Sequence, residues 1–117
     1  MNKQGKIWGS TTPLFNNGVV EIHRIHINKG GFCSKHLHEY KHNKFYIISG
    51  KLNIKVWKSD YDLCDETIIE TGESTSAPPK EYHTFEALED TEALEIYWVE
   101  LSSSDIVREN SGGIVTS

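Results

Sequence analysis

The chain has 117 residues, 37% of them hydrophobic and 25% charged, so we expect one domain with a buried core and no second domain. Its net charge is −5 and its lysines are scattered, which excludes the basic stripe that a nucleic-acid partner requires. No apolar run is long enough to span a membrane and no signal-peptide pattern follows the polar start, so we expect a cytoplasmic protein with no membrane partner.

Apolar residues are spaced as in short β-strands along most of the chain, and no segment keeps a helical period. The first strand is predicted from Val19 to Ile27, between turn sequences at 16–18 and 29–31. Within it the apolar residues change from one face of the strand to the other between Ile22 and Ile25, which predicts a β-bulge at that point.

A β-hairpin is predicted after this strand. The run from Phe45 to Ile48 is fully apolar, Ser49-Gly50 supplies the turn, and apolar residues alternate with polar ones from Lys51 to Trp57. The polar stretch from Lys58 to Glu66 lacks the EF-hand pattern, so we expect a surface loop and not a calcium site. The remaining strands are predicted at 67–70, 74–77, 83–88 and 93–101, with one capped helical turn at 102–105.

The number and spacing of these strands decide the fold class. Many short strands in a small chain favour a β-sandwich or barrel, and a double-sheet jelly roll closes around a central pocket. We therefore predict an all-β fold, a double-stranded β-helix, as a single domain over residues 1–117 with loose termini at 1–5 and 109–117. Because pairing across a two-fold axis covers exposed sheet edges, a homodimer is expected.

A closely spaced pair of histidines gives the strongest functional signal. Side chains alternate between the faces of a strand, so the i, i+2 spacing of His36 and His38 puts both imidazoles on one face. A third imidazole at His83, brought beside them by folding, would complete a metal site with positions open for water or substrate. The other histidines are expected to be exposed strand or loop residues: His23, His26 and His42.

The two cysteines, Cys33 and Cys64, are far apart and form no CxxC pair, which excludes a four-cysteine zinc site and predicts free thiols. Cys33 precedes His36 by three residues. On a continuous strand it would therefore face the opposite side from His36 and would not be a metal ligand.

The residues around the histidines resemble the two sequence motifs of the cupin superfamily. The first motif falls on Gly30, His36, His38, Asn43 and Gly50, and the second falls on Gly72, Pro78 and His83. The chain departs from the usual residues at Asn43 (usually glutamate), Lys80 (usually glycine) and Ala87 (usually asparagine). The resemblance implies a cupin jelly roll that binds a divalent transition metal: Zn, Mn, Fe, Co or Ni.

Asn43 is the departure that bears most on a metal site. The resemblance implies that it takes the place of the fourth ligand beside the three histidines, and an amide oxygen can bind a metal although it brings no negative charge. The metal affinity should therefore fall and the Lewis acidity of the bound ion should rise. His42 is an alternative ligand, but its parity relative to Asn43 turns it to the other face of a regular strand.

Over residues 6–108 the chain also resembles the C-terminal cupin domain of type II phosphomannose isomerases, including those fused to sugar-nucleotide pyrophosphorylases. The resemblance is carried by Lys6-Ile7-Trp8-Gly9, by Arg24 to Gly30 and by Ser104 to Arg108. These relatives continue into Glu-Asp-x-Tyr-Gly-Arg, whereas this chain reads Glu109-Asn110-Ser111-Gly112-Gly113. Part of a phosphosugar site is therefore expected to be absent.

This second resemblance implies a sugar or sugar phosphate as the small-molecule ligand and aldose–ketose phosphate isomerase (mannose-6-phosphate isomerase-like) or epimerase chemistry. Such chemistry needs a group that polarises the carbonyl oxygen, a base that moves a proton, and cations for the phosphate. The metal is expected to fill the first role, Glu81 the second, and Lys35, Lys80 or Arg108 the third.

Two other functions stay open at this point. A neutral three-histidine site with open positions also suits Fe(II) and O₂, as in a non-haem dioxygenase, and a pocket without chemistry would suit a sensor or binding domain. The lining of the pocket separates the three functions. Converging cations favour the sugar phosphate, an apolar pocket favours the dioxygenase, and a blocked pocket favours the sensor.

Overall fold

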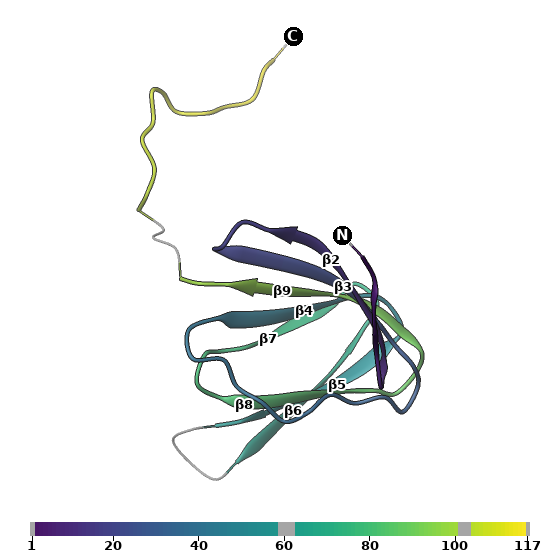
Figure 1. Ribbon diagram of the computed structural model, residues 1–117. Coiled ribbons are helices and arrows are strands. Elements are labelled where there is room, and N and C mark those ends of the chain that lie inside the picture. Colours follow the sequence, from purple (N-terminus) through teal and green to yellow (C-terminus); the bar gives the residue numbers. More distant parts are fainter. Residues whose placement is uncertain (1, 59–62, 101–103, 117) are drawn as a thin grey trace.

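The computed structural model describes residues 2–58, 63–100 and 104–116, and in these residues it contains β-strands and no helix (Figure 1). The described part of the chain therefore has no helix that could cross a membrane. The strands are β1 (Gln4–Lys6), β2 (Gly9–Asn16), β3 (Val20–Ile27), β4 (His42–Ser49), β5 (Lys51–Trp57), β6 (Cys64–Glu70), β7 (Ser74–Ala77), β8 (Tyr82–Ala87) and β9 (Thr91–Trp98).

The strands form two antiparallel sheets that face each other across the core (Figure 1). The larger sheet has six strands in the order β1-β2-β3-β9-β4-β7, and the smaller has three in the order β6-β5-β8. The segment between β3 and β4 runs along the edge of β8, where Phe32 bridges to Glu86 and His36 bridges to His83. This arrangement confirms the predicted all-β jelly roll.

The core between the sheets comes from alternate positions of the strands, because the side chains on one face of each strand point inward. The largest fully buried apolar side chains are Ile25 and Ile27 of β3, Phe45 and Ile47 of β4, and Leu52 and Ile54 of β5. Burying a side chain of this kind stabilises the fold by about 1.5–3 kcal/mol. Residues that share a face with these positions must therefore also point into the interior.

The predicted β-bulge lies on a different strand from the one expected. β3 pairs with β9 in unbroken register from Val20 to Ile27, whereas the register between β2 and β3 shifts at Leu14. The prediction of a bulge within β3 was therefore wrong. Ile25 and Ile27 point inward, so His23 points inward as well, and the parity shift in the sequence arises because a polar residue occupies an interior position.

Other boundaries also differ from the expected ones. β1 and β2 were not predicted, and Gln4 and Gly5 pair with β2 although residues 1–5 were expected to be loose. β6 begins at Cys64, inside the predicted surface loop. Its acidic side chains pair with lysines of the adjacent strand β5, as in Lys55 and Glu66 at 3.6 Å, so a polar sequence can form an exposed strand there.

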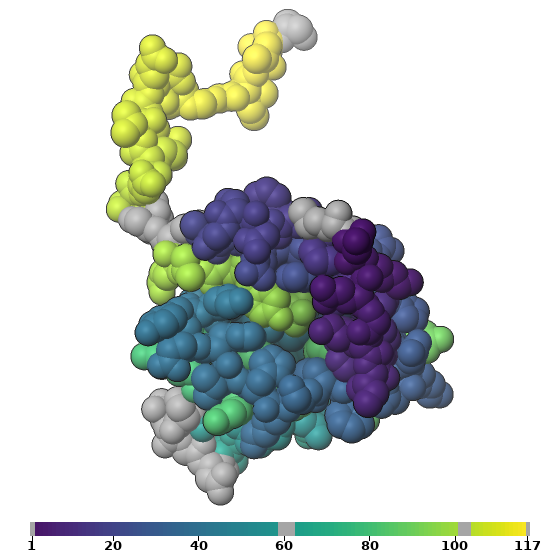
Figure 2. Space-filling view, in the orientation of Figure 1, coloured from purple at the N-terminus to yellow at the C-terminus, as the bar shows by residue number. Residues whose placement is uncertain are grey.

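Several expectations fall on residues that the structure does not describe. They are residues 59–62 of the predicted loop, Leu101 of the predicted last strand, and Ser102 and Ser103 of the predicted helical turn. From residue 104 to residue 116 the chain forms no helix or strand and leads away from the barrel (Figures 1 and 2).

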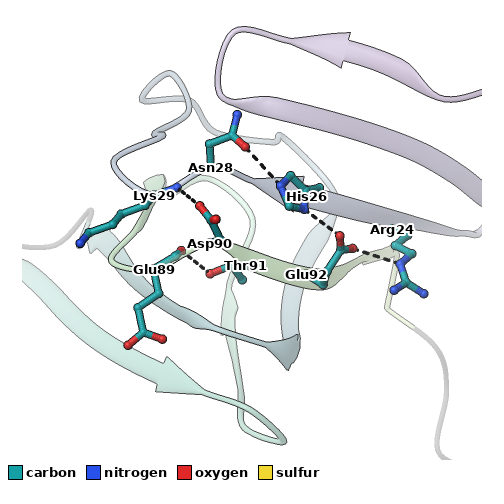
Figure 3. Close-up of polar contacts among 8 residues, drawn as sticks. All are labelled: Arg24, His26, Asn28, Lys29, Glu89, Asp90, Thr91 and Glu92. Carbon is teal, nitrogen blue, oxygen red and sulfur yellow. Dashed lines mark hydrogen bonds and ion pairs between the residues drawn. The ribbon is translucent and has the colours of Figure 1, made fainter.

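Polar contacts at the start of β9 fix its position beside β3 (Figure 3). Glu92 accepts hydrogen bonds from Arg24 Nε at 3.1 Å and from His26 Nδ1 at 2.7 Å. Asp90 Oδ1 accepts a hydrogen bond from the backbone N–H of Lys29 at 2.8 Å. Two side chains on the outer face of β3 and a backbone N–H just after the strand therefore hold the register of β3 and β9.

The turn between β4 and β5 packs against the same part of β9. The hydroxyl of the buried Thr91 accepts a hydrogen bond from the backbone N–H of Lys51 at 3.0 Å and donates one to the carbonyl of Glu89 at 2.9 Å. Gly50 lies so close to this region that an added Cβ would be 2.4 Å from the carbonyl oxygen of Asp90. A side chain at position 50 would push β9 out of place.

Gly50 and Gly72 both have positive φ, but of the two only Gly50 is in close contact with Asp90. Comparing their alanine variants therefore separates the cost of the close contact from the cost of backbone strain. Gly50 has φ +106° and no room for a Cβ, whereas Gly72 has φ +83° and nothing within 4 Å of the position that a Cβ would occupy. We expect Gly72→Ala to lower the free energy of unfolding by about 1 kcal/mol through strain alone. Gly50→Ala should lower it by about 3 kcal/mol or more, because the turn must also move. Equal losses in urea denaturation would contradict this account.

Candidate metal centre

Three histidine side chains converge beside β8. His36 and His38 lie on the segment between β3 and β4, and His83 lies on β8. Backbone hydrogen bonds connect the two segments, from the N–H of His83 to the carbonyl of His36 at 2.8 Å and in the reverse direction at 3.3 Å. One ring nitrogen of each histidine lies within 4.8 Å of the other two. The fold thus brings together the three imidazoles that the sequence predicted.

Hydrogen bonds select the ring nitrogen that each histidine can offer. His36 Nδ1 lies 2.7 Å from the carbonyl oxygen of Ser34, and His83 Nδ1 lies 3.1 Å from that of Glu81. A carbonyl accepts a proton from Nδ1–H, which leaves the lone pair on Nε2. The buried Nε2 atoms of His38 and His83 have no hydrogen-bond partner. Unpartnered nitrogen atoms of this kind fit a divalent transition metal.

The protonation state of the cluster also suits metal binding. Burial, with a smaller contribution from the neighbouring imidazoles of His36 and His83, lowers the pKa of His38 to about 4. Burial lowers the pKa of His83 as well, against the opposing effect of its hydrogen bond to Glu81. Both imidazoles are therefore neutral at pH 7 and keep the lone pairs that a metal binds.

Asn43 lies on the inward face of β4 with none of its surface exposed. Neither its amide oxygen nor its amide nitrogen has a hydrogen-bond partner that satisfies normal geometry. Glu95 is near enough for the amide to lower its pKa, but no contact there meets normal hydrogen-bond geometry, so the amide is left able to bind a ligand. His42, the alternative ligand, faces outward, where its ring stacks on Trp98 with centroids 5.1 Å apart.

A cavity of about 370 Å³ opens beside the histidine cluster. It is lined by Gln4, Lys6, Trp8, Thr11, Pro13, His23, Cys33, Ser34, His36, Phe85, Glu95 and Tyr97. These residues come from β1, β2, β3, β8 and β9, from the turn between β1 and β2, and from the segment before β4. One candidate metal ligand, His36, thus lies in the wall of a space that is large enough for a small organic molecule.

The cavity wall carries several groups that can hold a proton. Burial raises the pKa of Glu95, although contacts with Tyr97, His23, His36 and Asn43 oppose this effect. Burial also raises the pKa of Tyr97, and the nearby carboxyl group of Glu95 raises it further. The wall therefore combines a carboxyl group, a phenol and imidazoles, which are the side chains most used for proton transfer.

Two of these lining residues were expected elsewhere. His23 was expected to be exposed, but it is partly buried and faces the cavity. Cys33 was expected to face away from His36 on a continuous strand, but both line the cavity, because the segment that carries them is not a regular strand. Cys33 Sγ accepts a hydrogen bond from the backbone N–H of Phe85 at 3.2 Å, and burial raises its pKa to about 11, so it is a neutral thiol.

The residues predicted for catalysis and phosphate binding lie outside the lining of this cavity. Glu81 is 3.6 Å from Lys58 Nζ, and Lys80 and Arg108 are exposed. Lys35 Nζ lies over the ring of Trp57, 4.0 Å from its centroid. The roles assigned to these side chains stay predictions, and the lysine that does line the cavity is Lys6.

The low pKa of His38 predicts a pH dependence for the metal-free protein. Between its ordinary pKa of 6.5 and its folded value of about 4, His38 takes up a proton in the unfolded state and not in the folded state. Stability that is present above pH 6.5 should therefore be lost as the pH falls through this window. The loss should be at most about 1.4 kcal/mol per pH unit for this imidazole.

Urea denaturation of the metal-free protein at a series of pH values measures this effect. His38→Gln should flatten the slope, whereas His42→Gln removes an outward-facing imidazole and should leave it unchanged. The same slope in the wild type and in His38→Gln would show that His38 is not the group responsible.

Solved structures with a similar fold include proteins of several kinds. KdgF from Halomonas sp. has a TM-score of 0.73 at 14% identity, over 86% of this chain and 88% of that chain. CapF from Staphylococcus aureus, described as a capsular polysaccharide assembling protein, has a TM-score of 0.72 at 23% identity, over 89% and 32%. Bacillus subtilis oxalate decarboxylase, described with Mn(II) centres, has a TM-score of 0.76 at 14% identity, over 90% and 29%.

These similarities show the fold, and for CapF and oxalate decarboxylase this chain spans about a third of their length. No curated protein matches the sequence. The model of the cupin domain family matches residues 23–100, which hold the three histidines, Asn43 and the strands that form most of the barrel. The chain therefore belongs to the cupin domain family.

Proposed function

We propose that this cupin binds a sugar or sugar phosphate beside a divalent metal and catalyses an isomerase or epimerase reaction on it. The observation that carries this proposal is the shared cavity: His36 of the histidine cluster and the proton-bearing side chains Glu95 and Tyr97 line the same space. Moving a proton next to a carbonyl group needs these two elements side by side.

In this proposal His36, His38 and His83 hold the metal and Asn43 supplies a fourth, neutral ligand. The fit rests on the unpartnered nitrogens of the cluster and on the unpartnered amide of Asn43. Zn, Mn, Fe, Co and Ni all accept imidazole and amide ligands. When bound, the metal would supply Lewis acidity toward a carbonyl oxygen of the ligand.

The lining of the cavity supports a hydroxylated ligand. Thr11, Ser34 and Gln4 offer hydroxyl and amide groups, which can hydrogen-bond to sugar hydroxyl groups. Trp8 and Phe85 pack edge to face with centroids 5.0 Å apart and give the cavity an apolar side. Such a mixture of polar and aromatic groups suits a sugar better than a hydrocarbon.

A three-histidine iron dioxygenase is the second candidate. It is favoured by the composition of the cluster, which among the described residues contains no aspartate or glutamate. Neutral facial sites with open positions suit Fe(II) and O₂. In the part of the chain that the structure describes, Lys6 is the only lysine or arginine in the lining of the cavity, so converging cations do not support a phosphate group there. The proton-bearing wall of the cavity is the feature that favours the isomerase or epimerase instead. The cytoplasmic location and the homodimer remain predictions in both cases.

The proposed function can be tested with metal analysis and isotope exchange. Tag-free protein should contain about one divalent metal per chain, and the metal-loaded protein should exchange the hydrogen next to the carbonyl of mannose 6-phosphate or fructose 6-phosphate with D₂O, as seen by proton NMR. The double variant His36→Ala/His38→Ala should lose both the metal and the exchange, and His42→Ala should keep both.

Each other outcome would point to a different function. No metal in the wild type, and no rise in melting temperature with added metal beyond that of the double variant, would remove the metal site. Bound metal with no exchange and no ligand binding at millimolar sugar phosphate would favour the sensor. Consumption of O₂ by the Fe(II)-loaded protein would favour the dioxygenase.

The role of Asn43 predicts an order of metal affinity. If its amide oxygen binds the metal, Asn43→Glu should tighten binding by roughly tenfold, because a carboxylate replaces a neutral dipole. Asn43→Ala should weaken it by roughly tenfold and His83→Ala by ~100-fold or more, since a nitrogen ligand is then lost. Competition with a chelating dye measures the metal affinity of the wild type and of the three variants. Identical affinities for the wild type and both Asn43 variants would place this side chain outside the ligand set.

A further inference from the structure

His23 and Glu21 form a hydrogen-bonded pair in the cavity wall. Both lie on the inward face of β3, and His23 Nε2 is 3.3 Å from Glu21 Oε2. In the register between β3 and β9, His23 stands opposite Glu95 and Glu21 stands opposite Tyr97. The pair therefore belongs to a block of four polar side chains that spans two adjacent strands at the centre of the large sheet.

Tyr97 connects this block to the histidine cluster. Its ring is in edge contact with His23, at 5.9 Å between centroids, and with His38, at 5.2 Å. His23 and one member of the cluster, His36, also line the same cavity.

Glu21 lies further along the same face of β3 and is not part of the lining of the main cavity. It lines a second cavity of about 240 Å³ together with Tyr97 and Lys41. Lys41 Nζ is 3.9 Å from Glu21 Oε1, which places a cation beside the carboxylate. The hydrogen-bonded pair therefore extends from the main cavity to the second, and its two ends face different spaces.

The hydrogen bond determines which nitrogen of His23 can act as a base. A carboxylate accepts a proton from Nε2–H, so the neutral imidazole keeps its lone pair on Nδ1. When Nδ1 takes up a proton, the adjacent carboxylate stabilises the imidazolium that forms. A carboxylate that orients a histidine in this way is a common arrangement in general base catalysis.

We propose that His23, oriented by Glu21, is the residue that accepts a proton from the ligand in this cavity. For a sugar, the C–H bond next to the carbonyl breaks, the proton goes to Nδ1 of His23, and the electron pair moves toward the carbonyl oxygen to give an enediolate. Return of the proton to the neighbouring carbon, together with transfer of the hydroxyl proton from the second oxygen of the enediolate to the first, completes an isomerisation. An epimerisation instead requires a second group to deliver a proton to the opposite face of the same carbon. The proposal rests on the proposed function, because it requires a ligand held beside the histidine cluster.

Other titratable groups face His23 and compete for this role. They are Glu95 and Tyr97 on β9, Lys6 on β1, and Cys33 and His36 on the segment before β4. Glu95 is the strongest competitor, because its carboxyl group stands directly opposite His23 and lines the same cavity. A test of the proposal must therefore distinguish His23 from Glu95.

A count of the protons released on binding can make this distinction without a known substrate. Acetohydroxamic acid is neutral at pH 7 and chelates divalent metals as its anion, so its binding frees one proton. Calorimetry in two buffers with different ionisation enthalpies measures how much of that proton reaches the solvent. In the metal-loaded wild type we expect almost none to be released, because His23 takes it up. In His23→Gln about one proton per bound ligand should be released.

Three further variants complete the experiment. Glu21→Gln, which keeps the shape of the side chain, should release an intermediate fraction of the proton, because His23 loses its carboxylate. His42→Gln removes an imidazole that faces outward and should behave as the wild type. Glu95→Gln tests the strongest competitor, and it should still retain the proton because His23 is intact. A melting curve and the metal content of each variant confirm that the fold and the metal site are intact.

The outcomes that overturn the proposal are distinct from those that overturn the metal site. Release of a full proton by Glu95→Gln and not by His23→Gln would make Glu95 the acceptor. Release of a full proton by the wild type would show that no group in the cavity takes it up. A metal-loaded wild type that does not bind the hydroxamate would show that no open metal position faces His23, and this also overturns the proposal. A wild type that binds no metal removes the proposed function itself.

Discussion

The register of β9 between β3 and β4 is the constraint on which the site depends. It aligns Glu95 with His23 on one side and with Phe45 on the other, and it aligns Tyr97 with Asn43. Because the side-chain period of a strand is two residues, a slip of one residue would turn Glu95 and Tyr97 to the outside and bring their apolar neighbours into the cavity. The contacts of Asp90, Thr91 and Glu92 at the start of the strand are therefore part of the functional architecture, although they lie away from the site (Figure 3).

The strands β3, β9 and β4 supply both an apolar region and a polar region of the interior. On β3, Ile25 and Ile27 are fully buried in the core, whereas His23 and Glu21 face the cavities. The apolar region contributes the burial free energy that holds the sheets together, and this offsets the cost of the unpartnered polar atoms of the site. A metal that binds those atoms removes the cost, so metal binding and folding stability are coupled.

The sequence predicted the elements of the site that depend on local spacing. His36 and His38 stand two residues apart and meet His83 through the expected folding of the jelly roll, and His42 faces outward as its parity indicated. Parity failed for Cys33, because the segment 33–38 follows the edge of β8 without forming a regular strand. His36 and His38 lie on this same irregular segment and still converge, because the bridge of His36 to His83 holds the segment against β8. Parity alone is a firm basis for a prediction only where the strand pairing is regular.

The polar residues of the cavity wall were missed for a different reason. A histidine or glutamate at an inward position interrupts the apolar pattern that defines a strand, so the shift between Ile22 and Ile25 resembles the pattern of a bulge. The correct explanation is an interior polar residue at His23. Glu95 has the parity of the buried Ala93, and this alternation could have indicated its inward position.

Placement of charge is the property in which this site differs most from the cupin motif that it resembles. With Asn43 in place of glutamate, the proposed ligand set of three imidazoles and one amide would be neutral, so a divalent ion would keep its full charge within the barrel. Carboxyl groups are nevertheless present in the surrounding wall, at Glu95 and Glu21. A carboxyl group in the wall does not bind the metal and is free to hold a proton, which burial favours at Glu95, or to orient an imidazole, as Glu21 does for His23. With carboxyl groups in the wall and none among the ligands, the site would bind a metal less tightly but would have more side chains available for acid–base chemistry.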